Sequence, residues 1–500
     1  MHICYPKRPS RLALLICVAA LRSWAEVSLP SVLAEHMVLQ RGIPVHIWGN
    51  AAPSESVAVE FRGATRTAQA DKIGRWSVYL PAGDAGGPFT LTVRGQNTLT
   101  FSDVLVGDVW VASGQSNMEF KLHQVANAQT ELAAANHPRI RLFQVERNVS
   151  PYPVSDLKAK SWAECTPETA ENFSAVAYFF GRHLEDKLHV PIGLIDSTWG
   201  GTPAEAWTSL DDLGRDASLM PVFAQWGHMS DDVERRMLER EQARKEAEKA
   251  ASPGAEPKPL PWAPNERLSW MPAGLYNAMI APLTSYPIRG AIWYQGESNA
   301  APGRAPLYAQ LFKTLITDWR RNWAEGDFPF FFVQIANYKA SAGEDWPEVR
   351  DAQRQALSLV NTGMAVTIDI GNPDNIHPTN KQDVGLRLAL AARAVAYGEK
   401  IEYSGPLFRQ ATPLNNSLQV WFDHVGKGLV AKGGDLRGFE IAGPDAKFVP
   451  AEARIEGSSV VVSSTSVANP VYVRYGWSNN PDCNLFNADG LPASPFRSLK

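Results

Sequence analysis

The sequence predicts an α/β fold in which a doubly wound parallel sheet is flanked by two smaller β modules. Between residues 102 and 400, short apolar runs alternate with segments of helical periodicity, which is typical of a parallel sheet covered by helices. The segments on either side, residues 26–101 and 401–500, contain short β-type runs separated by Gly, Pro, Asn and Asp. A length of 500 residues also exceeds what one compact core accommodates, so several domains are expected.

Residues 1–25 are typical of a secretory signal peptide. Lys7, Arg8 and Arg11 precede an apolar stretch at residues 12–21, and Ser23-Trp24-Ala25 has the small residues of a cleavage site. We therefore expect the chain to be exported, to the periplasm or outside the cell, and to begin at Glu26 after processing. Neither this stretch nor any later one approaches the roughly 20 apolar residues of a transmembrane helix, so the sequence predicts no membrane span.

The β module at residues 26–101 is predicted to be a small sandwich, because its runs are short and closely spaced. Its strands are expected at residues 46–48, 57–61, 76–80 and 89–93. A second β module is expected at the end of the chain, with strands at residues 418–422, 460–462 and 471–475.

The central α/β domain is predicted to span residues 102–400. Its strands are expected at residues 109–112, 192–195, 291–294, 330–335 and 365–370, and its helices at residues 173–188, 307–323 and 382–396. A charged insertion interrupts it at about residues 211–270, with a helix-forming part at residues 231–250 and a Pro-rich part at residues 252–264. We interpret it as a solvated helix with a loose linker; a lid and an oligomer contact are the alternatives.

The net charge disfavours one class of function, and the cysteines leave two structural alternatives open. The formal net charge is −4, and loss of a leader with four basic and no acidic residues leaves the mature chain near −8, which disfavours a nucleic-acid-binding surface. Cys165 and Cys483 are the only cysteines beyond the leader. They are either a disulfide pair or two buried thiols. The sequence assigns no oligomeric state.

Four polar clusters each follow a predicted strand of the central domain. They are Gly114-Gln115-Ser116-Asn117-Met118, Trp199-Gly200-Gly201-Thr202, Gln295-Gly296-Glu297-Ser298-Asn299 and Asp374-Asn375-Ile376-His377-Pro378. The carboxyl ends of parallel strands meet at one edge of a sheet, where ligands bind in open α/β folds. Together the clusters supply the nucleophile, oxyanion donors, base and orienting carboxylate of a serine esterase.

Each cluster also has a plainer structural interpretation. Ser116 is a candidate nucleophile, or only a helix N-cap. Gly200 and Gly201 let backbone N–H groups approach a ligand, or form a tight turn. Gln295 is a candidate oxyanion donor and Glu297 a candidate partner for a histidine, or both only satisfy backbone groups at a strand end.

Asp374 and His377 are close enough in sequence for one short loop to hold both. A serine nucleophile needs a neutral imidazole as base and a carboxylate to orient it. The alternatives are a capping aspartate with a surface histidine, or a metal site formed by Asp369, Asp374 and His377. No second histidine has metal-ligand spacing and there is no HExxH motif, so neither a metal nor a cofactor is predicted.

These four blocks, in this order, resemble those of the SGNH hydrolases and are most similar to the sialate O-acetylesterases. The resemblance extends to Met37-Val38-Leu39-Gln40-Arg41 in the first β module. It implies Ser116 as nucleophile and oxyanion donor, His377 as base and Asp374 as its partner. It also implies further oxyanion donors and one alternative partner for the histidine. These are Gly200 or Gly201, Gln295 with Asn299 as a second candidate, and Glu297.

The sequence departs from the namesake SGNH block at Gln115, where those hydrolases have an aspartate. The implied reaction is two-step acyl transfer through an acetyl-serine, without a metal or organic cofactor. The implied substrate is an acetylated sugar or glycan, first of all O-acetylated sialic acid. Acetylxylan or another plant polysaccharide is the alternative substrate, and a non-catalytic carbohydrate-binding protein is the alternative of another class.

Overall fold

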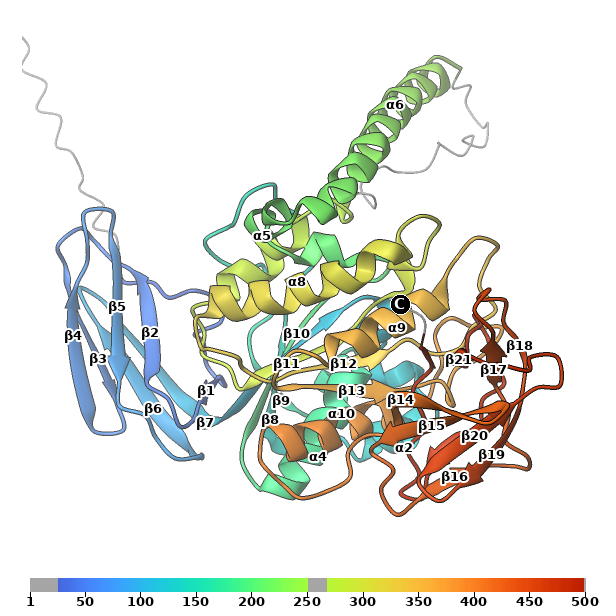
Figure 1. Ribbon diagram of the computed structural model, residues 1–500. Coiled ribbons are helices and arrows are strands. Elements are labelled where there is room, and N and C mark those ends of the chain that lie inside the picture. Colours follow the sequence, from blue (N-terminus) through green and yellow to red (C-terminus); the bar gives the residue numbers. More distant parts are fainter. Residues whose placement is uncertain (1–25, 251–267, 499–500) are drawn as a thin grey trace, which may run out of the picture.

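The structure is a computed structural model that describes residues 26–250 and 268–498 (Figure 1). The predicted signal peptide and the predicted Pro-rich linker at residues 252–264 therefore lie outside the described residues. In the described part, three bodies follow one another along the chain: a β domain, an α/β domain and a second β module (Figure 1).

A parallel sheet forms the centre of the α/β domain. Its strands lie in the order β13-β12-β11-β7-β10-β8, and a short antiparallel strand, β9, pairs with β8. Their bounds are β7 Thr98–Gly114, β8 His137–Gln144, β9 Ala163–Cys165, β10 Ile192–Thr198, β11 Gly290–Tyr294, β12 Phe330–Gln334 and β13 Thr362–Val366. After β7, the chain first forms β8, β9 and β10 on one side of that strand and then β11, β12 and β13 on the other. The carboxyl end of β7 is therefore the switch point at which ligands bind in doubly wound sheets.

Helices cover both faces of this sheet, as predicted. α4 (Ala175–Leu188) and α10 (Lys381–Val395) pack together on one face, and α8 (Ala305–Trp323) and α9 (Trp346–Ala356) pack together on the other (Figure 1). Ser174 and Asn380 cap the first turns of α4 and α10 with their side-chain oxygens. The shorter helices are α1 Ser116–Glu119, α2 Ala128–Ala133, α3 Pro167–Ala170 and α5 Leu210–Arg215, with 3-10 turns at Leu122–Gln124, Ala204–Trp207, Ala217–Leu219, Ala281–Leu283 and Glu297–Asn299 and a π turn at Tyr276–Ile280.

One predicted strand is misplaced. We expected a strand at residues 365–370, whereas β13 spans Thr362–Val366 and the chain turns directly after it. Apolar side chains continue through Ile368 and Ile370, but the hydrogen bond from Ile370 N–H to the Thr367 carbonyl closes a turn there. β8 and α9 were not predicted from the sequence.

The amino-terminal domain is a sheet packed against a two-stranded ribbon. The sheet pairs β4 (Ala64–Gln69), β3 (Ser56–Phe61), β6 (Gly86–Arg94), β7 and β1 (Val38–Gln40). The ribbon consists of β2 (Val45–Asn50) and β5 (Arg75–Leu80). β7 has 17 residues and runs from this domain into the central sheet, across the boundary predicted at residue 101. One continuous strand therefore joins the two bodies.

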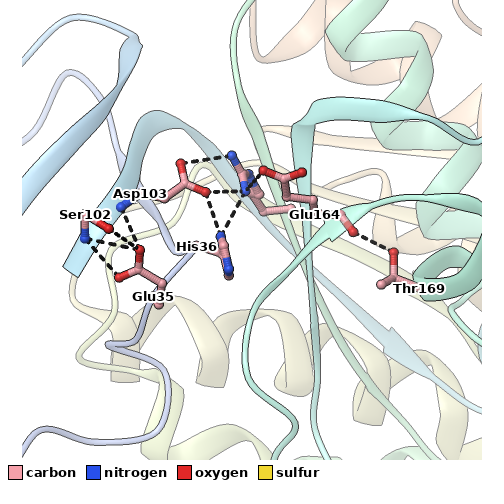
Figure 2. Close-up of polar contacts among 7 residues, drawn as sticks. Glu35, His36, Ser102, Asp103, Glu164 and Thr169 are labelled. Carbon is pink, nitrogen blue, oxygen red and sulfur yellow. Dashed lines mark hydrogen bonds and ion pairs between the residues drawn. The ribbon is translucent and has the colours of Figure 1, made fainter.

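A charged cluster lies where the two bodies meet. Figure 2 shows His36, Asp103 and Glu164 converging from different segments. The buried guanidinium of Arg141, on β8, donates to Asp103 Oδ2 over 2.7 Å and to Glu164 Oε1 over 3.0 Å. His36 Nδ1 lies 2.6 Å from the same Asp103 oxygen. The cluster thus ties the start of β7 to the edge of the central sheet.

The carboxyl-terminal module has a hydrophobic core of its own, which includes Phe422, Phe439, Tyr475 and Phe496. One sheet pairs β14 (Leu407–Leu414), β15 (Ser417–Asp423), β20 (Ser459–Ser463) and β19 (Glu452–Glu456), and a second pairs β18 (Val449–Pro450), β17 (Phe439–Ala442), β21 (Tyr472–Tyr475) and β23 (Phe496–Arg497). β16 (Leu429–Ala431) pairs with β22 (Leu485–Asn487). All three strands predicted here are present.

The charged insertion begins with α5 and continues as α6 (Met220–Ala250), a helix that projects away from the central sheet (Figure 1). Among the described residues, no helix combines the length and apolar character that crossing a bilayer requires. Cys165 and Cys483 are both free thiols, so the disulfide alternative is wrong for this structure.

Candidate active site

Ser116 lies at the end of β7, immediately after a sharp turn. Gly114 has φ +134°, and a Cβ atom at this position would lie 2.2 Å from the Tyr294 carbonyl oxygen, so only glycine fits. The chain then enters α1, whose first residue is Ser116 and whose N-cap is Gln115. The interpretation of Ser116 as the N-cap is therefore wrong. As the first residue of the helix, Ser116 has no intrahelical acceptor for its N–H.

His377 reaches Ser116 from the loop that follows β13. Asn372 Oδ1 accepts from Asp374 N–H and Asn375 Oδ1 accepts from His377 N–H, both over 2.9 Å, and these Asx turns shape the loop. Asn117 Nδ2 donates to the Ile376 carbonyl over 3.0 Å and so ties the loop to α1. His377 Nε2 and Ser116 Oγ are 2.8 Å apart, the distance of a hydrogen bond between a base and its nucleophile.

Asp374 lies on the same loop but points elsewhere. Its side chain is 79% exposed, and Lys339 Nζ donates to its Oδ1 over 3.0 Å. Among the hydrogen bonds and ion pairs of the described residues, none joins Asp374 to His377. The structure therefore places the two residues on one loop without a contact between them.

Glu297 is the buried carboxylate of the site. Asn117 Nδ2 donates to Glu297 Oε1 over 2.6 Å, and Lys381 Nζ donates to Asn117 Oδ1 over 2.6 Å. The other oxygen, Glu297 Oε2, has no hydrogen-bond partner among the described residues. Glu297 and Lys381 are thus two buried ionisable groups that share the side-chain amide of Asn117, the residue that follows Ser116.

Burial shifts the pKa values of Glu297, Lys381 and His377. It raises the pKa of Glu297 and lowers the pKa of Lys381 to about 7, against the effect of Glu297. Partial burial, and then the positive charge of Lys381, lower the pKa of His377 below its usual value. A lower pKa favours the neutral imidazole, which is the form that accepts a proton from serine.

The Gly200-Gly201 turn lies beside Ser116. A Cβ atom on Gly200 would lie 3.2 Å from the Ser116 Cβ, so the turn packs directly on the serine. Gly200 N–H donates to Glu119 Oε2 over 2.8 Å. No acceptor for Gly201 N–H is present among the described residues, and Gly201 lines the cavity. Gly201 therefore offers a free backbone donor.

Gln295 is completely buried. Its Nε2 donates to Asn299 Oδ1 over 2.6 Å and to the Thr202 carbonyl over 3.2 Å, and its Oε1 accepts from the Tyr308 hydroxyl over 2.9 Å. Asn299 Nδ2 in turn donates to Glu205 Oε2 over 3.0 Å. Both amides that the sequence offered as oxyanion donors thus make interior hydrogen bonds, and neither residue lines the cavity.

Gln115 is the cavity-lining amide that sequence reasoning missed. Its Oε1 accepts from Ser298 N–H over 3.2 Å and from Gly296 N–H over 3.4 Å. Its Nε2 has no acceptor among the described residues, and the side chain lines the cavity beside Ser116. The available signal was the departure from the namesake block at this position, where an amide replaces a carboxylate.

These residues open into a cavity of about 980 Å³. Its lining joins residues of the predicted clusters, Trp199 among them, to side chains that the sequence did not indicate, namely Arg147, Met229, Ser269, Trp270, Tyr338 and Glu344. Met229 lies on α6, so the charged insertion contributes to the wall.

The third member of the metal-site alternative, Asp369, is held by Arg387, whose Nη1 and Nη2 donate to its two oxygens over 2.6 and 2.7 Å. Arg387 thus already neutralises the Asp369 carboxylate. Within the described ranges, the one group of His, Cys, Asp and Glu side chains close enough to share a metal is His36, Asp103 and Glu164, at the domain junction.

Comparison with known proteins gives consistent results. The family model "carbohydrate esterase, sialic acid-specific acetylesterase" matches residues 261–396. The sialate O-acetylesterase of Mus musculus is 34% identical over 93% of this chain and 93% of its own length, and that of Homo sapiens is 33% identical over 93% and 91%. The crystal structure of a carbohydrate acetylesterase from Xanthomonas citri has a TM-score of 0.82 and 42% identity, covering 95% of this chain and all of that one.

Proposed function

This chain belongs to the sialate O-acetylesterase family and is a carboxylic ester hydrolase, and we propose that it removes acetyl groups from sialic acid hydroxyls through an acetyl-Ser116 intermediate. The observation that carries the proposal is the 2.8 Å contact between His377 Nε2 and Ser116 Oγ at the floor of a 980 Å³ cavity. A serine with a base in hydrogen-bond contact and a substrate-sized cavity above it meets the requirements of acyl transfer.

The reaction has two steps. His377 takes the Ser116 proton as Oγ attacks the acetyl carbonyl, and the resulting imidazolium gives that proton to the departing sugar oxygen. Water then enters the cavity, loses a proton to His377 and attacks the acetyl-serine. Acetate leaves and Ser116 recovers its proton. The lowered pKa of His377 keeps the imidazole neutral at the start of each step.

The oxyanion would be bound by the N–H groups of Ser116 and of the Gly200-Gly201 turn, together with one side-chain amide. Gly201 N–H is the free donor of the turn, whereas Gly200 N–H would first have to leave Glu119. Two residues are candidates for this amide. Family resemblance favours Gln295, whereas Gln115 is the one that lines the cavity beside Ser116. Each such donor commonly lowers the barrier by about 3–4 kcal/mol.

We propose Asp374 as the carboxylate that orients His377. Among the described residues, only Lys339 holds its exposed side chain, and an exposed ion pair of this kind is worth no more than about 1 kcal/mol, so the carboxylate is free to reorient. Catalytic hydrogen bonds are often unformed before substrate binds. The buried Glu297 is the alternative, because one of its oxygens has no hydrogen-bond partner in the part of the chain that the structure describes.

Arg147 supports sialic acid as the sugar. Sialic acids carry a carboxylate, and the Arg147 guanidinium lines the cavity over the ring of Trp199, at 5.6 Å from the ring centroid. Trp199 and Trp270 provide flat apolar faces for a pyranose ring. Arg147 is also paired with Glu119, so a substrate carboxylate would share it.

The test is acetate release from 9-O-acetylated sialic acid and, in parallel, from acetylated xylan, by wild type and by Ser116→Ala. We expect wild type to prefer the sialic acid ester and Ser116→Ala to lose at least about 10⁴-fold in kcat. Full activity in Ser116→Ala would overturn the mechanism; release from xylan alone would overturn the sugar. Comparing Asp374→Asn with Glu297→Gln then assigns the carboxylate, and we expect the larger loss of kcat from Asp374→Asn.

We also propose that the chain is exported, on the strength of the basic, apolar and small-residue succession in residues 1–25. The intact mass of the protein recovered outside the cytoplasm of an expression host tests this. A chain that begins at Glu26 is expected, and an unprocessed cytoplasmic chain would contradict the proposal.

A further inference from the structure

A second large cavity lies on the amino-terminal domain. It has a volume of about 1100 Å³ and is bounded by the β2–β5 ribbon, by residues 28–30 and by residues 153–156 of the α/β domain. Nothing in the esterase mechanism uses it.

Strand register places six side chains on one face of the ribbon. His46 pairs with Tyr79, Trp48 with Ser77, and Asn50 with Arg75. Because side chains alternate between the two faces of a strand, these six residues project to the same side. All six line the cavity, whereas the alternate side chains Val45, Ile47, Val78 and Leu80 are buried in the core of the domain and do not line it. Trp76 is also buried but contributes to the lining. The cavity floor is thus the outward face of the ribbon.

Three aromatic rings stack on this floor. The rings of His46 and Tyr79 have centroids 4.4 Å apart and planes 8° apart, and those of His46 and Trp48 have centroids 4.8 Å apart and planes 19° apart. Tyr79, at the outer end, is 61% exposed. Stacking of this kind contributes about 0.5–1.5 kcal/mol per pair. That gain accounts for the stack but not for an exposed tyrosine within a concave surface, a combination that marks binding sites.

Polar side chains with unused hydrogen-bonding capacity surround the rings. Among the described residues, no side-chain hydrogen bond is present for Asn50, Arg75 or Ser77. Asp156, on the opposite wall, is already occupied by the backbone N–H and hydroxyl of Ser31. Flat apolar rings next to free amide, guanidinium and hydroxyl groups match a pyranose, which has an apolar C–H face and a rim of hydroxyls.

The cavity lies at the opposite end of the central sheet from Ser116. His46 Nδ1 is 2.9 Å from the Ser285 carbonyl oxygen, just before β11, whereas the active site follows the carboxyl end of β11. The five residues of β11 alone span about 13 Å, which is four rises of about 3.3 Å each in a parallel strand. A single sugar residue therefore does not reach both places.

We propose that the β2–β5 face is a carbohydrate-binding cleft that holds neutral pyranose residues of a glycan, separate from the residue whose ester is cleaved. The inference rests on the proposed function for its substrate class, since a sugar esterase encounters its ester on glycans. Tyr79, the exposed ring of the stack, makes the main contact with the glycan, and the cleft retains the enzyme on a glycan surface without taking part in the reaction.

The test measures binding apart from catalysis. Binding of N-acetyllactosamine tetrasaccharide and xylohexaose is followed by calorimetry with the Ser116→Ala chain, with and without Tyr79→Ala. Tyr472→Ala, a partly exposed tyrosine on β21 of the other β module, is the matched control. We expect at least one oligosaccharide to bind, Tyr79→Ala to weaken it about tenfold or more, and Tyr472→Ala to leave it unchanged.

Absence of binding at millimolar concentration, or binding that survives Tyr79→Ala, would overturn the cleft. A second measurement, acetate release from a small acetyl ester, keeps the two proposals apart. It uses the Tyr79→Ala variant of the chain that retains Ser116, and we expect this variant to release acetate at the wild-type rate. Loss of that rate together with a lowered melting temperature would mean that Tyr79 stabilises the fold instead. If no sugar ester is cleaved but the oligosaccharide binds through Tyr79, the proposed function fails and the cleft stands.

Discussion

His377 has a protonation equilibrium set by burial and by the neighbouring charge of Lys381, both of which lower its pKa. Because the base must be neutral, a lowered pKa keeps it active at more acidic pH. The acidic limb of kcat/KM is therefore expected below pH 6.5, the usual imidazole value. Lys381→Met removes the nearby positive charge, so the His377 pKa should rise and the limb should move to higher pH.

Lys381→Arg is the control for that pH profile, because it keeps the charge, and it should leave the limb in place. Lys381→Met also leaves the buried Glu297 without a nearby positive charge, which should destabilise the fold. The double variant with Glu297→Gln removes that penalty, so it isolates the effect on the pKa of His377. A limb that does not move, or that moves to lower pH, in the double variant would contradict this account.

Gln115 and Gln295 differ in what their amide nitrogens can reach. Gln115→Glu keeps the oxygen that accepts from Ser298 N–H but replaces the free Nε2 donor. We expect kcat/KM to fall about 100- to 1000-fold with little change in melting temperature. Gln295→Glu instead places a carboxylate oxygen against Asn299 Oδ1 in the interior, so melting temperature should fall with activity.

Kinetics of the two variants, measured beside thermal unfolding, decide which amide binds the oxyanion. Wild-type kinetics in Gln115→Glu would show that its Nε2 plays no part. An activity loss in folded Gln295→Glu would favour the donor that family resemblance suggests. The sequence could name both amides, but not which one faces the cavity, because that depends on where the Thr202 carbonyl and Asn299 lie in space.

At the scale of elements, Gly114 controls how β7 delivers the nucleophile. Its φ of +134° is a region for glycine alone, and an added Cβ would meet the Tyr294 carbonyl of the neighbouring strand β11. Gly114→Ala should cost about 1–3 kcal/mol in backbone strain and more in the clash. Because Ser116 lies two residues further on, we also expect kcat to fall more than about tenfold.

Gly214→Ala is the matched control for Gly114→Ala. It lies in α5, where an added Cβ meets no atom within 4 Å, so the change should be neutral or slightly stabilising. Urea unfolding and acetate release measure both variants. Wild-type stability and activity in Gly114→Ala would mean that β7 and β11 tolerate separation and that the turn does not fix Ser116.

Elements with regular apolar periodicity could be predicted, and those stabilised by buried polar groups could not. The predicted segments that lie within β7, β10, β11 and β12 are short runs made mainly of apolar residues. β8 was missed because Pro138, Arg139 and Arg141 interrupt its pattern. α9 was missed because it buries Arg350, Asp351 and Gln353.

Arg350 shows why those positions are polar. Its guanidinium donates over 2.8 Å to the backbone carbonyls of Ala336, Ser478 and Asn479, which joins α9 to the carboxyl-terminal module. Asn479 also accepts hydrogen bonds from the backbone N–H groups of Tyr338 and Trp346. It thereby holds both ends of a segment whose Tyr338 and Glu344 line the cavity. Single-sequence periodicity contains no information about such cross-domain bonds.

At the scale of the whole molecule, Arg141 joins the amino-terminal domain to the central sheet. Its side chain is 4% exposed and contacts Asp103, Glu164 and His36. Removing one member of a fully buried ion pair typically costs about 3–5 kcal/mol. Because Asp103 and Glu164 are 21% and 45% exposed, Arg141→Met should lower the free energy of unfolding by less than that amount but by more than an exposed pair contributes. Arg94→Met, in an ion pair whose two side chains are 57% and 48% exposed, should cost no more than about 1 kcal/mol.

Activity per folded molecule should be unchanged in Arg141→Met, since the cluster lies beside the amino end of β7 and Ser116 follows its carboxyl end. Urea unfolding and kinetics below the transition measure the two quantities. Equal stability losses in Arg141→Met and Arg94→Met would mean that the junction does not depend on this ion pair.

The same cluster has the ligand atoms of a metal site, because His36, Asp103 and Glu164 each offer one atom within 4.8 Å of the others. Arg141 Nη1, however, lies 2.7 Å from Asp103, 3.0 Å from Glu164 and 3.3 Å from His36 Nδ1, so a cation already occupies the centre. We expect neither EDTA nor Zn²⁺ to change the melting temperature of wild type. Arg141→Ala frees the three ligands, so Zn²⁺ should raise its melting temperature. Zn²⁺ that stabilises wild type equally would show that the guanidinium does not exclude the metal.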